Sequence, residues 1–198
     1  MEHIGRCRAC RYSKHIGRRK GGKVFRRDVA TPGSRVAQVV ISDYPAPVVV
    51  SNIRRNVSKN IPCTLSSNVS VEGHEWGVLD DKFSTERAQG FSRVIAADCY
   101  WMPHQHQNLA RSMLHFLSRD EEARVYAIAG FHTGRNKLAA FFDVAVEEGL
   151  EIEEIYEEDS DGVRREWVKE KDEGRENVTE RKRWLVTAIL RRAGEGKI

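Results

Sequence analysis

The 198-residue sequence lacks the features of membrane and secreted proteins. A membrane-spanning helix needs about 20 consecutive apolar residues, and no run approaches that length. No N-terminal stretch has the apolar centre of a secretory signal, and the chain has only four cysteines, Cys7, Cys10, Cys63 and Cys99. These absences predict a soluble, cytoplasmic protein with free thiols and no membrane partner.

Metal and nucleic-acid signatures are also weak. Cys7 and Cys10 lie near His3 and His15, but a structural zinc site needs a second well-spaced ligand pair, so we expect no metal. The basic residues 14–23 have no interleaved aromatic side chains on which bases could stack, which argues against a nucleic-acid partner.

What the sequence has is enough apolar content for one domain and an uneven distribution of charge. Hydrophobic residues make up 40% of the chain, and the formal net charge is +4. Residues 1–36 carry eleven Lys/Arg against two acidic residues, so the remainder has a net charge of −5. We therefore predict a basic, disordered or aberrant segment over 1–34, in which only residues 23–30 could form a weak strand, a domain over 35–192, and a tail over 193–198. We expect the protein to be a monomer.

From residue 35 onward, apolar runs alternate with segments of helical periodicity. Continuous apolar strands between amphipathic helices indicate a parallel sheet with helices on both faces. The predicted strands lie at 36–41, 68–72, 93–98 and 124–130, and the predicted helices lie near 50–57, from 104, and over 136–148.

The last third departs from this alternation. Residues 151–158 and 183–190 read as strands, and the acidic stretch between them, up to about Thr179, reads as disordered. Two consecutive strands without a crossover helix predict a C-terminal antiparallel β-hairpin at one edge of the sheet.

Four motifs give this Rossmann-like α/β pattern a family resemblance. They are residues 40–45 (VISDYP), 73–77 (GHEWG), 96–101 (AADCYW) and 181–186 (RKRWLV). Their order and spacing resemble the class I, seven-β-strand S-adenosylmethionine-dependent methyltransferases. Within that class they resemble the lysine methyltransferase-like family, which includes fungal elongation-factor methyltransferases and proteins named nicotinamide N-methyltransferases. The resemblance covers residues 35–192 and implies S-adenosyl-L-methionine as cofactor.

Two side chains are candidates for cofactor binding on physical grounds. Asp43, at the carboxyl end of a predicted parallel strand, can accept hydrogen bonds from both hydroxyls of a ribose, although an aspartate before Tyr-Pro also suits a turn or a helix cap. Trp76, between two glycines, can offer a flat wall to an adenine ring or fill the edge of the core. The resemblance favours the cofactor role for both.

The end of the 93–98 strand carries the candidate methyl-transfer residues. By resemblance, the small Ala97 lies against the cofactor, and Asp98 with Trp101 matches the acidic-x-x-aromatic motif of the family, a better match than Tyr100. A carboxylate can hold an amine and assist its loss of a proton, whereas the plain structural alternative for Asp98 is a helix cap.

The loop after the 124–130 strand supplies the substrate-contact candidates. His132 and Arg135 would lie on the same rim, where loops carry specificity, unless they are loop caps and solvated charges.

One element of the resembled fold is not recognisable. Its central first strand should lead into a glycine-rich turn about 15 to 25 residues before Asp43, given the length of a crossover helix. Residues 18–25 contain glycines there but lack both a preceding apolar strand and an acidic-Gly-x-Gly pattern. We therefore expect the central strand and the loop to be missing, through N-terminal truncation of the gene model.

The resemblance implies methylation of a protein lysine or N-terminal amine, with a translation elongation factor as the substrate it suggests. Two alternatives stay open: N-methylation of nicotinamide or another small molecule, and a catalytically inactive, truncated methyltransferase-like protein.

Overall fold

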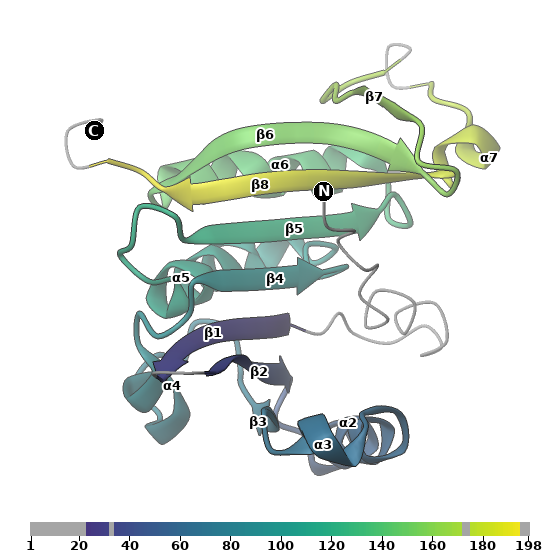
Figure 1. The fold of residues 1–198 in the computed structure, drawn as a ribbon. Coiled ribbons are helices and arrows are strands. Elements are labelled where there is room, and N and C mark those ends of the chain that lie inside the picture. The colour runs from purple at the N-terminus through teal and green to yellow at the C-terminus, as the bar shows by residue number, and fades with distance from the viewer. Residues whose placement is uncertain (1–22, 32–33, 172–174, 195–198) are drawn as a thin grey trace.

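The computed structural model describes residues 23–31, 34–171 and 175–194, and of residues 23–31 and 34–37 it describes the backbone alone. These residues form an eight-stranded sheet in the order β3-β2-β1-β4-β5-β8-β6-β7 (Figure 1). The strands are β1 (Lys23–Thr31), β2 (Ser34–Asp43), β3 (Val69–Gly73), β4 (Arg93–Ala97), β5 (Arg124–Gly130), β6 (Leu150–Asp159), β7 (Arg164–Glu166) and β8 (Trp184–Arg192).

Two groups of helices pack against this sheet. The helices are α2 (Pro47–Asn60), α3 (Cys63–Ser66), α4 (Lys82–Arg87), α5 (His106–Phe116), which follows the short 3-10 helix η1 (Pro103–Gln105), α6 (Arg135–Glu147) and α7 (Val178–Arg181). In Figure 1, α5 and α6 lie behind the sheet. The crossover from β2 to β3 runs across the sheet in the opposite direction from that between β4 and β5, so right-handed connections place α2 on the other face. No helix in these described ranges is long and apolar enough to cross a membrane.

The strand directions confirm the predicted class of α/β fold. β2, β3, β4 and β5 point the same way, whereas β8 runs antiparallel to both β5 and β6. The C-terminal edge is therefore antiparallel, as the two consecutive strands at the end of the sequence indicate.

The main core lies between the sheet and the α5–α6 layer. Alternate residues of β5 are buried on the helix-covered side, as expected for period-two burial. From the helices, Met113 and Phe116 of α5 and Phe141 of α6 are fully buried. Phe141 stacks on Tyr100, with ring centroids 4.7 Å apart and planes 21° apart.

The prediction that the sheet lacks a central strand is wrong. β1 fills the position between β2 and β4, antiparallel to both, with Lys23 paired to Ser42 on one side and Ala96 on the other. Without it the facing edges of β2 and β4 would leave backbone groups without partners inside the sheet, which is costly. The predicted domain boundary at residue 34 falls inside the β1–β2 hairpin.

The direction of β1 bears on the expected loss of the glycine-rich loop. That loop follows the carboxyl end of the central strand in the resembled fold, but here that end, Thr31, lies at the opposite edge from the carboxyl ends of β2 and β4. The strand end at the shared edge is Lys23. The residues before it lie outside the described ranges, so the absence of a functional glycine-rich loop stays a prediction.

The acidic stretch before Thr179 is more ordered than its composition suggests. It contains β7 and the start of α7, and the side chain of Glu176 is only 6% exposed. The prediction of disorder is wrong for residues 160–171 and 175–179, where Arg164, Arg165, Lys169 and Glu176 form ion pairs within the fold.

Truncation of Phe141 tests the packing of the core. Phe141→Ala should lower the free energy of unfolding by about 3–5 kcal/mol, because it leaves a cavity beside Tyr100. Val146→Ala on the same helix removes a side chain that is 51% exposed, and should change it by less than about 0.5 kcal/mol. Urea denaturation followed by circular dichroism measures both, and similar effects of the two variants would contradict this packing.

Candidate functional site

The carboxyl ends of the four parallel strands form one edge of the sheet. Ser42 and Ala96 pair with Lys23 from opposite sides, so they lie at the same level, two strand spacings or about 10 Å apart. Asp43 and Ala97 follow one residue later. The structure therefore brings the predicted cofactor residues of β2 and β4 to one edge of the sheet, the edge at which open α/β sheets bind ligands.

Asp43 closes β2 and is tied to its surroundings through both backbone and side chain. Its Oδ1 accepts a hydrogen bond of 2.7 Å from the backbone N–H of Tyr44, and its carbonyl oxygen accepts one of 2.8 Å from that of His74. The turn after β2 approaches β3 so closely that a Cβ on Gly73 would lie 2.9 Å from Pro45. Glycine at this strand end allows the two loops to meet.

Trp76 lies in the loop after β3 and packs, half-buried, against the main core. The next residue, Gly77, has a φ of +86° and donates its N–H to Ser112 Oγ at 2.9 Å. A side chain at Gly77 would clash with Asn108. The loop is thus docked on α5, which fixes where the indole can lie.

A buried polar network beneath this loop was not apparent from the sequence. His74 Nδ1 lies 3.3 Å from Ser84 Oγ, which donates to the carbonyl oxygen of Val78, so the serine must accept from a protonated Nδ1. His74 Nε2 then accepts from Ser112 Oγ at 3.1 Å. Through Ser84 and Ser112, the buried imidazole of His74 links the loop to α4 and α5.

Asp98, at the end of β4, has a left-handed backbone. Its φ is +55°, its N–H donates to Ile128 carbonyl oxygen at 2.7 Å, and its Oδ1 lies 3.4 Å from the N–H of Gly130. The exposed His132 ring also covers Gly130, since a Cβ there would lie 2.8 Å from His132 Nε2. The structure therefore brings Asp98 and His132 together around Gly130.

The two aromatic residues that follow Asp98, Tyr100 and Trp101, differ in how deeply they are buried. Tyr100 is fully buried in the core, and burial raises the pKa of its hydroxyl well above the ordinary value. Trp101 stays half-buried near the surface. Of the two, Trp101 is the aromatic side chain that a molecule at the sheet edge could reach.

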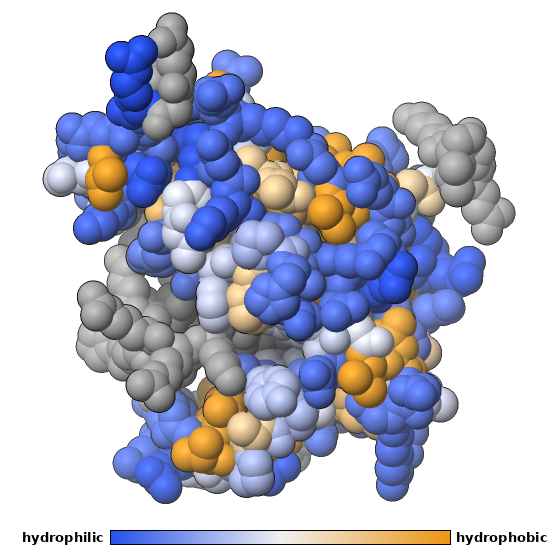
Figure 2. All heavy atoms as spheres, turned by 180° about the vertical axis from the view of Figure 1, so that it is seen from behind, coloured by the Kyte–Doolittle hydropathy of each residue, from blue (hydrophilic) through white to orange (hydrophobic). Residues whose placement is uncertain are grey.

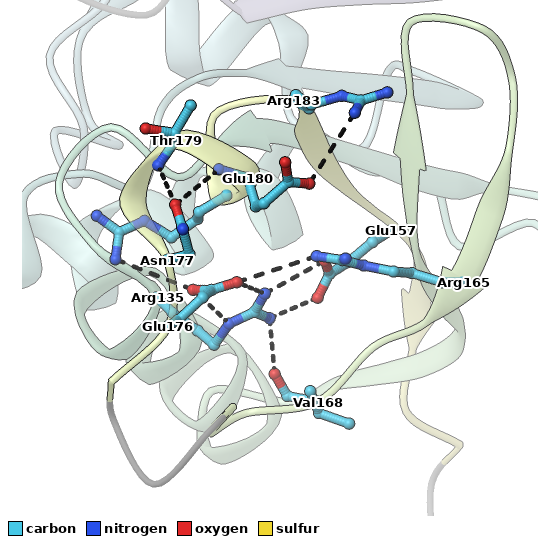
Figure 3. A network of polar contacts seen from close by, with 10 residues as sticks. Arg135, Glu157, Arg165, Val168, Glu176, Asn177, Thr179, Glu180 and Arg183 are labelled. Carbon is cyan, nitrogen blue, oxygen red and sulfur yellow. Dashed lines mark hydrogen bonds and ion pairs between the residues drawn. The ribbon is translucent and has the colours of Figure 1, made fainter.

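Arg135 lies in a different environment from the substrate-contact position expected for it. Its side chain is 4% exposed and donates to both carboxylate oxygens of Glu157, to both of Glu176 and to the carbonyl of Val168 (Figure 3). The guanidinium also lies 4.4 Å from the ring centroid of Phe131. All of its donors are directed into the protein, so Arg135 organises the rim rather than reaching outward.

Further charges extend this ion network. Arg165 donates to Glu157 Oε2 at 2.6 Å and stacks over Trp184, while Arg181 Nη1 lies 3.9 Å from Glu176. Burial opposes ionisation of Glu176, but hydrogen bonds from Arg135 and nearby cations outweigh it and lower its pKa. Glu157 and Glu176 come from the C-terminal third of the chain. Within its acidic stretch, Trp167, which packs against the main core, is the sequence signal for packing.

The described part of the chain contains no candidate site for a metal ion. Among the described residues, no group of three or more His, Cys, Asp or Glu side chains could hold a metal ion. Cys7 and Cys10 lie outside the described ranges.

Replacement of Glu176 tests the ion network through pH. Because the folded-state pKa of Glu176 lies below the ordinary 4.5, its ionised form stabilises the fold above that value and stops doing so as pH falls through the folded pKa. Glu176→Gln should cost about 2–4 kcal/mol at pH 7 and less at pH 3, which lies below the ordinary pKa. Thermal denaturation at both pH values measures this, with the exposed Glu166→Gln as control. A cost independent of pH would contradict the assignment.

Comparison with known proteins places this arrangement in a family. A sequence model described as lysine methyltransferase matches residues 28–148. The protein N-terminal and lysine N-methyltransferase efm7 of Emericella nidulans is 28% identical over 128 residues, covering 60% of this chain and 49% of that protein. The EFM7 protein of Candida glabrata is 31% identical over 124 residues, covering 60% and 47%.

The chain spans about half the length of these curated relatives. Among solved structures, a predicted O-methyltransferase from Agrobacterium tumefaciens is similar with a TM-score of 0.46 and 14% identity, covering 76% of this chain and 61% of that one. The match over residues 28–148, which includes β2 to β5 and the edge carrying Asp43, Ala97 and Asp98, shows that the chain belongs to the lysine methyltransferase family.

Proposed function

We propose that this chain binds S-adenosylmethionine and transfers its methyl group to an amine of a protein, either a lysine side chain or an N-terminal amino group. The observation that carries the proposal is the shared strand edge, where Asp43 and Ala97 lie at one level and Asp98 follows directly. S-adenosylmethionine is the cofactor that membership of this methyltransferase family implies.

The residues at this edge fit the nucleoside part of the cofactor. A carboxylate can accept about four hydrogen bonds, so the bond from Tyr44 to Asp43 is compatible with the binding of two ribose hydroxyls. Trp76 presents a half-buried indole in a loop that is held in place by Ser112. Asp43 would hold the ribose, Trp76 would pack on the adenine, and the small Ala97 would allow close approach.

Asp98 and Trp101 are the residues we assign to the transfer step. When bound, the cofactor supplies an electrophilic methyl group on a positively charged sulfur. The amine must arrive without its extra proton, and positioning and exclusion of water supply most of the rate enhancement. The Asp98 carboxylate, fixed by its turn and by Gly130, would orient the amine and accept its proton, and Trp101 would shield it from water.

The class of substrate follows from the relatives. The matched proteins are named protein N-terminal and lysine N-methyltransferases. Beyond those names, the family resemblance of the four sequence motifs suggests a translation elongation factor in the cytoplasm as the substrate. His132, exposed on the rim beside Asp98, is the candidate contact to that substrate.

Replacement of Asp43 tests the binding site. Asp43→Asn should weaken binding of S-adenosylmethionine by about 10- to 100-fold, since hydrogen bonds to a charged group contribute about 1.5–3 kcal/mol. Isothermal titration calorimetry on the full chain measures this. The control Asp161→Asn changes an exposed turn residue and should bind as the wild type does. A folded wild-type chain that binds no S-adenosylmethionine would refute the proposed function.

Replacement of Asp98 separates chemistry from cofactor binding. Asparagine tolerates the left-handed backbone, so Asp98→Asn should keep the fold and the cofactor affinity while lowering kcat by about 10²-fold or more. Transfer of labelled methyl groups to lysate proteins provides the assay, with nicotinamide as the alternative acceptor. Labelling of nicotinamide alone would replace the protein-amine assignment with a small-molecule one, and an unchanged kcat would remove Asp98 from the reaction.

A further inference from the structure

A cavity with mostly basic walls opens beside the proposed site. It has a volume of about 230 Å³ and is lined by the amino-terminal turn of α6 and by residues from the segment that follows β7. The charged side chains in its wall are those of Arg135, Lys137, Lys171, Glu176 and Arg181. Among the described residues of the wall, four cations and one carboxylate give an excess of positive charge.

The negative charge in this wall is already matched. Glu176 accepts hydrogen bonds of 2.7 and 3.1 Å from Arg135, which also pairs with Glu157 outside the cavity. Arg181 comes no closer than 3.9 Å to Glu176, and its buried Nε has no hydrogen-bond partner among the described residues. Arg135, Lys171 and Arg181 therefore share the single carboxylate of Glu176, so positive charge is in excess among the described lining residues.

The start of α6 adds backbone donors to the same wall. Gly134 precedes the helix with a φ of +100°, and no side chain in the described part of the chain caps the helix. The first N–H groups of a helix have no partner within it, and they carry the positive end of the helix dipole. Residues 133–137, which include this turn, all line the cavity.

The cavity is close to the transfer site and has a firm inner wall. Gly130, whose N–H faces Asp98 Oδ1, is three residues before Thr133, a span of at most about 10 Å. The ion pairs of Arg135 hold α6, β6 and the segment around Val168 together (Figure 3). A charged side chain of the substrate that enters this cavity would therefore belong to a residue only a few positions from the amine that Asp98 holds.

We propose that this cavity binds an acidic side chain of the substrate protein, aspartate or glutamate, located within about four residues of the methylated amine. The inference rests on the proposed function and adds to it a preference for a substrate sequence. The carboxylate would meet Lys137, Lys171 and the amino-terminal turn of α6.

Paired peptides test this preference. Fluorescein-labelled twelve-residue peptides carry a central lysine and, at one flanking position at a time, either glutamate or glutamine. Fluorescence anisotropy with the full chain should show about tenfold tighter binding of the glutamate peptide at one or two positions near the lysine. The preference should weaken as salt is added.

Charge reversal identifies the cavity as the origin of the preference. The double variant Lys137→Glu/Lys171→Glu should lose the preference for glutamate and instead favour a peptide with arginine at the same position. Both lysines line an open cavity, so the fold should persist, and Lys82→Glu, on a side chain that is 88% exposed in α4, is the matched control that should keep the preference.

The outcomes separate the two proposals. Equal binding of the glutamate and glutamine peptides within twofold, or a preference that survives charge reversal, would overturn the cavity assignment while S-adenosylmethionine binding stays intact. Failure to bind S-adenosylmethionine with a retained preference for glutamate would instead contradict the proposed enzymatic function.

Discussion

The contact between Arg135 and two carboxylates is the interaction on which the C-terminal half of the structure depends. A guanidinium that is 4% exposed is tolerable only because Glu157 and Glu176 match its charge and its donors. Since Glu157 lies on β6 and Glu176 just before α7, this one residue joins α6 to two segments that lie far apart in sequence. Removing either carboxylate would leave an incompletely paired charge in a dry site.

The other constraint is the filling of the sheet centre by β1. β1 runs against its neighbours, so it leaves the order of β2, β3, β4 and β5 intact and keeps their carboxyl ends at one edge. Asp43 and Asp98 consequently lie at the same edge of the sheet, although β1 separates their strands. The geometry of the proposed nucleoside site thus depends on a hairpin whose first strand runs opposite to the central strand expected of a methyltransferase core.

The sequence predicts the bounds of strands and helices best where buried residues recur with a regular period. The bounds of β5 match the expected 124–130, and α6 begins one residue before its predicted start, because both elements bury one face in the core. Prediction fails where the partners lie elsewhere in the chain: β1 is paired along its backbone with β2 and β4, and the charge of Glu176 is matched by Arg135. The motifs located Asp98 and Trp101, but nothing in the sequence distinguished the buried Arg135 from the exposed His132.

The left-handed turn at Asp98 has an evolutionary consequence. Only glycine, asparagine and aspartate adopt a φ of +55° at little cost, so the backbone alone restricts which residues can replace Asp98. A descendant that had lost activity could therefore drift to asparagine or glycine and still fold. Among relatives with this turn, an aspartate that is kept although asparagine would fit the backbone equally well would indicate selection for catalysis. A small polar residue at this position would by itself indicate only that the backbone turn is kept.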